Sequence, residues 1–324
     1  MNVNMVCDFF NSNFLCVFDI LLYCQIFNPI WAYFPNTLKD GNYQFNDDDD
    51  NIIKSYCKDN IDKCETDLDK INVGCFVLFE IFFKDSNSLM ENAKNNINIA
   101  GYILGWLSYM LSLKENVGIN NLQDFYDKYI KNKEMYNKKL TDVIGYDSYM
   151  DLIDKYKELM TINISSMPDF YGPLKSLCDM YTECIRSKSD CTNCLEKAKD
   201  FDSKYRELNG SDIKGNNSYM NILYSLSTDY NNLKKYISEN CINFSDISSF
   251  PEIKPPEGYF KIFEAASSSS SIASKLIPAL LIFAIPIFLG IAYKYSLFGF
   301  DKRLHRQYLR EKIKKIKREM DHYI

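Results

Sequence analysis

The sequence predicts an all-α fold: a helical, cysteine-containing ectodomain followed by one C-terminal transmembrane helix and a short basic tail. Three observations predict it. From about residue 67 onward, apolar residues recur at helical spacing, with little of the alternation that marks strands. Residues 276–293 carry no charged side chain. All eleven cysteines precede this apolar run.

The apolar run is predicted to cross a membrane. Its 18 residues are close to the minimum for a hydrocarbon layer of about 30 Å. Lys275 and Lys294 can extend their ammonium groups to the interfaces, which widens the span to residues 272–298. Pro278 and Pro286 would each cost about 3 kcal/mol inside a soluble helix, whereas membrane helices tolerate proline more readily. A membrane span is therefore favoured over a buried helix of a soluble core.

The charge distribution predicts the orientation of this span. Residues 1–274 hold 27 basic and 39 acidic side chains, whereas residues 294–324 hold 10 basic and 4 acidic ones. By the positive-inside rule, the C-terminus is cytoplasmic and the ectodomain lies outside the cell or in a lumen. The basic residues predicted to flank the membrane are Lys275, Lys294, Lys302, Arg303 and Arg306.

The tail, residues 299–324, has two interpretations. Leu309, Ile313, Ile316 and Met320 recur at helical spacing among basic residues, which is typical of a helix that lies against anionic inner-leaflet lipid. A solvated charged tail that only stops translocation fits the same residues.

The N-terminal segment, residues 1–33, is hydrophobic and fits no standard role. As a signal peptide it lacks a basic start, since the first lysine is Lys39. As a membrane span it would bury Asp19 at a cost of about 2.5–3.5 kcal/mol. A segment of the core and a segment foreign to the mature protein both remain open.

The ectodomain, residues 34–249, is predicted to be a helical bundle. Residues 67–83 place their apolar side chains on one face. Residues 96–113 are apolar nearly all round, which indicates a central helix packed on several sides, with a second span as the alternative. Gly and Pro residues separate the further helices, which are expected at residues 122–131, 146–160, 170–187, 191–208 and 219–236.

Residues 250–271 are rich first in proline and then in serine. This composition predicts a connector between the ectodomain and the membrane that is semi-stiff at first and flexible later.

The cysteines are expected to form structural disulfides, because the predicted orientation places them in an oxidising compartment. The cluster from residue 178 to residue 194 also has the spacing for a four-cysteine zinc site or a redox pair, which are the alternatives. The candidate disulfide residues are Cys57, Cys64, Cys75, Cys178, Cys184, Cys191, Cys194 and Cys241.

Catalysis is not expected. The two histidines, His305 and His322, both lie in the tail, so the ectodomain has no histidine to activate a nucleophile or bind zinc. The sequence contains no GxxxxGK[ST] or GxGxxG motif. No catalytic residue, cofactor, metal ion or nucleic-acid partner is therefore predicted.

Several segments together resemble a known family. They are FPNTLKDGNYQF (34–45), SYCKDNIDKCETDLDKINVGCFVLFEIFFKDS (55–86), INIAGYILGWLSYML (97–111), YGPLKSLCDMYTE (171–183), DCTNCLEKAKDFDSKYRELN (190–209), SLSTDYNNLKK (225–235) and the serine-rich, apolar and basic C-terminal region. In this order they resemble the Plasmodium interspersed repeat (PIR) variant proteins of malaria parasites, of the rodent-parasite type.

The resemblance implies a helical outer domain, one C-terminal span and a short cytoplasmic tail. It also implies an exported variant surface antigen at or near the surface of the infected red cell or the parasite, with a role in antigenic variation and host-cell interaction. The implied partners are the lipid bilayer and host receptors or antibodies, with no ligand identified. The alternative is a non-catalytic structural or trafficking protein of parasite or vacuolar membranes.

One segment departs from the family pattern. Family members have a short polar start before the part that matches FPNTL, whereas residues 11–30 are rich in Phe, Leu, Ile, Asn and Tyr. Noncoding AT-rich DNA would encode such residues. This suggests the hypothesis of a retained intron or an error in the gene model, in which Cys16 and Cys24 are not framework cysteines.

Overall fold

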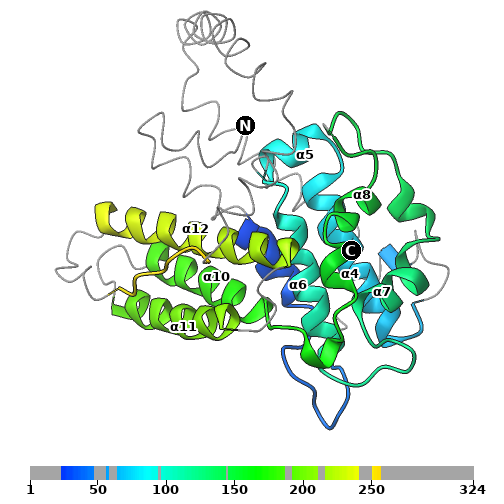
Figure 1. Cartoon of the computed structure of the whole chain (residues 1–324), viewed down its shortest axis with the longest axis horizontal. Coiled ribbons are helices and arrows are strands. Elements are labelled where there is room, and N and C mark those ends of the chain that lie inside the picture. Colours follow the sequence, from blue (N-terminus) through cyan, green and yellow to red (C-terminus); the bar gives the residue numbers. More distant parts are fainter. Residues whose placement is uncertain are drawn as a thin grey trace, which may run out of the picture. The chain divides into compact units, whose positions relative to one another are not determined.

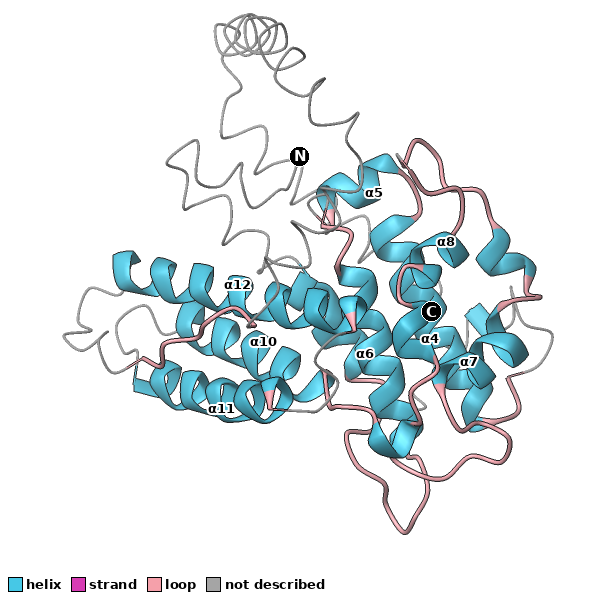
Figure 2. Cartoon of the chain, in the orientation of Figure 1, coloured by secondary structure: helices cyan, strands magenta, loops and turns pink. Residues whose placement is uncertain are grey.

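Helices are the regular elements in the part of the chain that the computed structural model describes, and β-pairing there is limited to isolated bridges (Figure 2). The described residues are 23–46, 56–57, 64–93, 96–143, 145–186, 192–210, 216–240 and 250–256. They belong to one compact unit, residues 1–257. The second unit, residues 258–324, lies outside them, and with it the predicted span and tail. The all-α prediction is confirmed for the described residues.

The first helix of the described chain comprises residues 23–31. The later elements (Figure 1) are α4 (Asp67–Phe83), α5 (Ser86–Glu91), α6 (Ile99–Ser112), α7 (Leu122–Phe125), η1 (Tyr126–Ile130), η2 (Glu134–Asn137), α8 (Tyr149–Asp154), α9 (Lys157–Met160), η3 (Ile164–Ser166), α10 (Tyr171–Arg186), α11 (Thr192–Asn209) and α12 (Asn217–Asn240). Among the described helices, none is both long and apolar enough to cross a membrane.

Helix α4 begins at a capping box. The Thr66 hydroxyl accepts a hydrogen bond from the Asp69 backbone N–H at 3.1 Å, and the Asp69 carboxylate accepts one from the Thr66 N–H at 2.9 Å. These bonds satisfy backbone donors that a helix start otherwise leaves unpaired. The predicted apolar face follows, and residues 71–79 are all buried.

Helix α6 is the central helix that its apolar sequence predicted. It contacts α4, α8, α10 and α12, and only two of its 14 residues are not fully buried. Two glycines permit the close approach of its neighbours. A Cβ at Gly101 would lie 2.8 Å from the Tyr156 ring and 2.9 Å from Ile222, and a Cβ at Gly105 would lie 2.7 Å from Phe170.

Residues 23–34 are part of the core. Phe27 stacks on Trp31 with ring centroids 4.9 Å apart and also contacts Phe82 of α4, at 5.2 Å. Trp31 meets Tyr171 of α10 edge-on at 5.0 Å. The structure therefore favours the core interpretation for this segment. The hypothesis of a foreign segment now concerns residues 11–22, which lie outside the described residues.

Helices α10, α11 and α12 pack together, and an extended segment runs along them. Residues 250–256, gold in Figure 1, follow α12 after a gap of nine residues. Phe250 and Ile253 are 3% and 4% exposed. Residues 250–256, the first part of the predicted stalk, thus lie against the helical domain, and residues 257–271 of that stalk lie outside the described residues.

We predict that Gly101→Ala destabilises the protein. Alanine has a helix propensity better than glycine by about 1 kcal/mol, but the new methyl group would overlap Tyr156 and Ile222, and such overpacking costs about 1–3 kcal/mol. Urea unfolding of the full chain in detergent measures the loss. Asn87→Ala, at an exposed position of α5, is the control. A Gly101→Ala chain more stable than the parent would contradict the close packing.

Candidate functional site: a disulfide-braced helical scaffold

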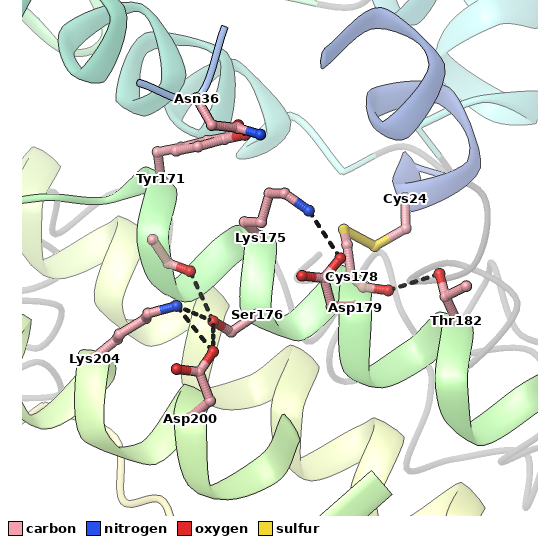
Figure 3. Close-up of polar contacts among 11 residues, drawn as sticks. Cys24, Asn36, Tyr171, Lys175, Ser176, Cys178, Asp179, Thr182, Asp200 and Lys204 are labelled. Atoms are coloured by element: carbon pink, nitrogen blue, oxygen red, sulfur yellow. Dashed lines mark hydrogen bonds and ion pairs between the residues drawn. A yellow bond between two sulfur atoms is a disulfide. The ribbon is translucent and has the colours of Figure 1, made fainter. Parts of the chain in front are cut away.

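Three disulfides brace the described domain. Cys24–Cys178 joins the helix of residues 23–31 to α10 (Figure 3). Cys184–Cys194 joins α10 to α11, and Cys57–Cys64 closes a short loop before α4. The first bond is the most consequential, because it connects residues that are 154 positions apart.

The eight candidate cysteines divide into three groups: five in disulfides, two outside the described residues, and Cys75, which is a free thiol. Cys57, Cys64, Cys178, Cys184 and Cys194 are in disulfides. Cys191 and Cys241 lie outside the described residues, as do Lys275, Lys294, Lys302, Arg303 and Arg306. Cys24 was not among the candidates, because it lies in the segment that departs from the family pattern.

Cys75 requires a correction, because it was a disulfide candidate and is a free thiol. It lies in the middle of α4 and is fully buried. Burial raises the pKa of the Cys75 thiol to about 12, although a hydrogen bond with Tyr136 acts in the opposite direction. The thiol therefore stays protonated and acts as a small apolar side chain.

The pairing also decides between the alternatives for the cysteine cluster. Cys194 is bonded to Cys184 of α10, not to Cys191, its neighbour in the CxxC sequence. Within the described ranges, no three His, Cys, Asp or Glu side chains are placed to hold a metal ion. Because Cys184 and Cys194 are joined to each other, the disulfide interpretation is favoured for these two cysteines.

A polar cluster connects α10 and α11 beside the Cys24–Cys178 bond (Figure 3). The Ser176 hydroxyl lies 2.5 Å from the Asp200 carboxylate and 3.0 Å from the Gly172 carbonyl oxygen. The Lys204 ammonium donates to Ser176 at 2.8 Å and to Asp200 at 2.9 Å. Burial raises the pKa of Asp200, but the hydrogen bonds from Ser176 and Lys204 and the lysine charge outweigh it and leave that pKa below its usual value.

A serine beside a lysine can in principle form a nucleophile pair. Here Ser176 is only 1% exposed, so its oxygen faces the helix interface and not solvent. The cluster therefore holds two helices in register.

A second polar cluster lies at the junction of three helices. The carboxylate of Asp229 in α12 accepts hydrogen bonds from Tyr23 and from Tyr102 of α6, each at 2.8 Å. Burial raises the pKa of Asp229 to about 6, against the opposing effect of the two tyrosine hydrogen bonds. No basic side chain contributes to this shift, so the charged form is poorly compensated.

The exposed surface of the described domain is mostly polar. Its exposed large apolar side chains are Met90, at 52%, and Val117, at 94%. Val117 precedes Gly118, which has φ +75° in the turn after α6. Exposed lysines gather in η1 and in the chain between η1 and α8, at Lys128, Lys131, Lys133, Lys138 and Lys139.

The family model described as "Plasmodium variant antigen protein Cir/Yir/Bir" matches residues 24–294. The chain belongs to this family. The match begins at Cys24, the partner of Cys178, and includes the apolar run after the described domain. The resemblance found in the sequence motifs is thereby confirmed.

A solved structure supports the family at the level of the fold. It is titled "Structure of a Plasmodium PIR protein ectodomain" and is 29% identical to this chain, with a TM-score of 0.53. The similarity covers 74% of this chain and 98% of that ectodomain. Comparison with curated proteins finds no match.

We predict that replacing both Cys24 and Cys178 by alanine lowers the free energy of unfolding of this PIR-family protein by about 3–5 kcal/mol. The bond closes a loop of 154 residues, and the loss of unfolded-chain entropy grows with loop length. Replacing Cys57 and Cys64, which are seven residues apart, should cost only about 2 kcal/mol. Urea unfolding under non-reducing conditions measures both. Equal losses would show that Cys24–Cys178 does not constrain the chain in this way.

We also predict that Asp229→Asn removes a pH dependence of stability. The pKa of Asp229 is raised from 3.8 to about 6 in the folded protein, so the folded state binds more protons between these values, and stability falls as pH rises through this window. At neutral pH the ionised group costs up to about 3 kcal/mol, which the asparagine variant should recover in part. Unfolding midpoints at pH 4 and pH 7 measure the difference.

The control for this prediction is Asp200, whose pKa is shifted in the opposite direction from that of Asp229. The pKa of Asp200 is lowered, so its contribution is present above its unfolded pKa and is lost as pH falls. Asp200→Asn should therefore reduce stability most at neutral pH. A parent chain and an Asp229→Asn chain with parallel pH profiles would refute a raised pKa at Asp229.

Proposed function

We propose that the protein is an exported, single-pass surface antigen that presents its helical ectodomain to host cells and antibodies. The observation that carries the proposal is the extent of the family match, which continues from the disulfide-braced domain to residue 294 and so includes the apolar run. The disulfide-braced domain and the candidate membrane anchor thus both lie within the region that the family model matches.

The disulfides support an outward-facing domain. Every described cysteine except Cys75 is bonded, and such bonds persist in oxidising compartments. The basic excess behind the apolar run points the same way, because it favours a cytoplasmic tail. The infected red-cell surface or the parasite surface is the location we propose, and antigenic variation and host-cell interaction are the role.

The structure supports presentation of a surface as the activity. The polar clusters described above are occupied by contacts between helices, and the buried serine of the Ser176 cluster is closed to substrate. A ligand would be a host receptor or an antibody that reads exposed side chains, while the tail contacts anionic inner-leaflet lipid.

We predict that the ectodomain can be cut on intact infected cells. A recognition sequence for a site-specific protease, inserted between Val117 and Gly118, would lie in an exposed turn and avoid the intrinsic resistance of a folded domain. With an epitope tag after Ile324, surface display yields a shortened tagged fragment on a reducing gel when protease is added outside the cell, because Cys24–Cys178 joins the two sides of the cut until it is reduced. Loop tips tolerate such insertions well.

The matched controls are the parent chain without the inserted sequence and the inserted chain in permeabilised cells. A tagged chain that stays intact on whole cells but is cut after permeabilisation would contradict display on the surface of the infected red cell. It would support the alternative role in parasite or vacuolar membranes.

A further inference from the structure

Residues 250–256, here called the strap, lie on the domain as an extended, proline-containing segment with the sequence FPEIKPP. Phe250, Ile253 and Pro256 are buried, whereas Glu252, Lys254 and Pro255 are exposed. A burial period of three residues is that of a polyproline II helix. The strap therefore presents one apolar edge to the domain and leaves its backbone carbonyl groups available as acceptors.

Four side chains donate hydrogen bonds to these carbonyl groups, and we call them the strap-binding face. Tyr205 of α11 donates to the carbonyl of Lys254 at 3.2 Å. From α12, Tyr230 donates to that of Pro251 at 3.0 Å and Asn231 to that of Ile253 at 2.9 Å. Lys234 donates to the carbonyls of Phe250 and Pro251, at 3.0 and 3.2 Å.

Aromatic rings give this face a fixed shape. Phe201 makes a stacked contact with each of the two tyrosines, with ring centroids 5.7 Å from Tyr205 and 4.7 Å from Tyr230. Burial raises the pKa of Tyr205 to about 12, so its hydroxyl remains a donor at every physiological pH. Aromatic rings with hydrogen-bond donors directed at carbonyl groups are how proteins recognise polyproline II segments.

We propose that the strap-binding face is a docking site for a proline-containing extended segment in trans, and that neighbouring copies of this chain exchange their straps through it. The strap-binding face donates hydrogen bonds to backbone carbonyl groups of the strap and covers three of its side chains. A second copy has the same strap, which can therefore make the same contacts. Exchange of an identical element between copies is a low-cost route to association.

The connection between α12 and the strap is long enough for such an exchange. Nine residues, 241–249, separate α12 from the strap, and a chain of this length can span about 30 Å when extended. Each hydrogen bond to the strap makes a modest net contribution to stability, and release of the strap returns the conformational entropy of seven residues. Exchange breaks and remakes the same contacts, so the bound strap of a second copy replaces the chain's own without loss of contacts. The proposed membrane anchoring would hold the straps of neighbouring copies at one height above the bilayer, but the docking itself does not depend on it.

A labelled peptide tests the docking. The probe is the heptapeptide FPEIKPP with a fluorophore, and the protein is the full chain in detergent with Ile253→Asp, which introduces a charge into the apolar edge of its own strap. We expect the peptide to bind this chain at least about tenfold more tightly than the parent, whose own strap competes. Phe250→Ser is a second strap variant for the case in which Ile253→Asp does not fold.

Adding Lys234→Met to the strap variant should weaken peptide binding by about tenfold, which is the usual effect of losing a hydrogen bond from a charged donor. Lys235→Met, at the exposed neighbouring position, should leave peptide binding unchanged. A folded Ile253→Asp chain that does not bind the peptide, or that binds it equally with Met at position 234, would overturn the docking site.

Mixing tests the exchange between copies. A chain with a defective strap (Ile253→Asp) and a differently tagged chain with a defective face (Lys234→Met with Tyr230→Phe) should co-purify, whereas neither should self-associate through the strap. Peptide binding without co-purification of the two chains would overturn the exchange.

Discussion

The covalent bond between Cys24 and Cys178 is the constraint on which the rest of the domain depends. It fixes the helix of residues 23–31 against α10, and α10 in turn contacts α6, α11 and α12. Tyr171, at the start of α10, donates to the Asn36 side chain at 2.8 Å and contacts Trp31 and Tyr109. A single helix thus connects the N-terminal segment, the central helix and the C-terminal helices.

The polar groups of the interior are placed where helices meet. Asn72 of α4 accepts a hydrogen bond from Tyr136 at 2.9 Å, and Asp229 accepts two from helices far apart in the chain. Each bond specifies one arrangement of neighbours, because an unpaired buried polar group would cost about 1–3 kcal/mol. At neutral pH the ionised Asp229 also costs folding free energy, because burial raises its pKa. Its two tyrosine donors nevertheless fix the positions of the three helices relative to one another.

Local patterns predicted the elements well. The helices expected at residues 170–187 and 191–208 are α10 (Tyr171–Arg186) and α11 (Thr192–Asn209), because apolar spacing and flanking breakers specify a helix without its partners. The one expected at residues 146–160 is broken into α8 and α9 at Tyr156, which is fully buried and whose ring lies against Gly101 of α6. That break depends on packing against another helix, which the local pattern does not encode.

Long-range partners were the part that sequence reasoning missed. The sequence around Cys24 does not indicate that this residue is bonded to Cys178 of α10. The sequence around Cys75 does not indicate that its thiol lies against Tyr136. Composition predicted a connector to the membrane from residue 250 onward, but it did not indicate that residues 250–256 dock on the domain, because this docking depends on four donors from α11 and α12. The membrane-flanking residues, from Lys275 to Arg306, remain predictions.

Buried positions hold this fold together and exposed positions contribute little to it, which fits a member of a variant antigen family. Disulfides, aromatic contacts and buried polar bonds hold the helices together, and they involve positions that are mostly hidden from solvent. Exposed substitutions away from such features change stability by about 0.5 kcal/mol or less. The exposed surface can therefore change widely while the disulfide frame and α10 continue to specify one fold.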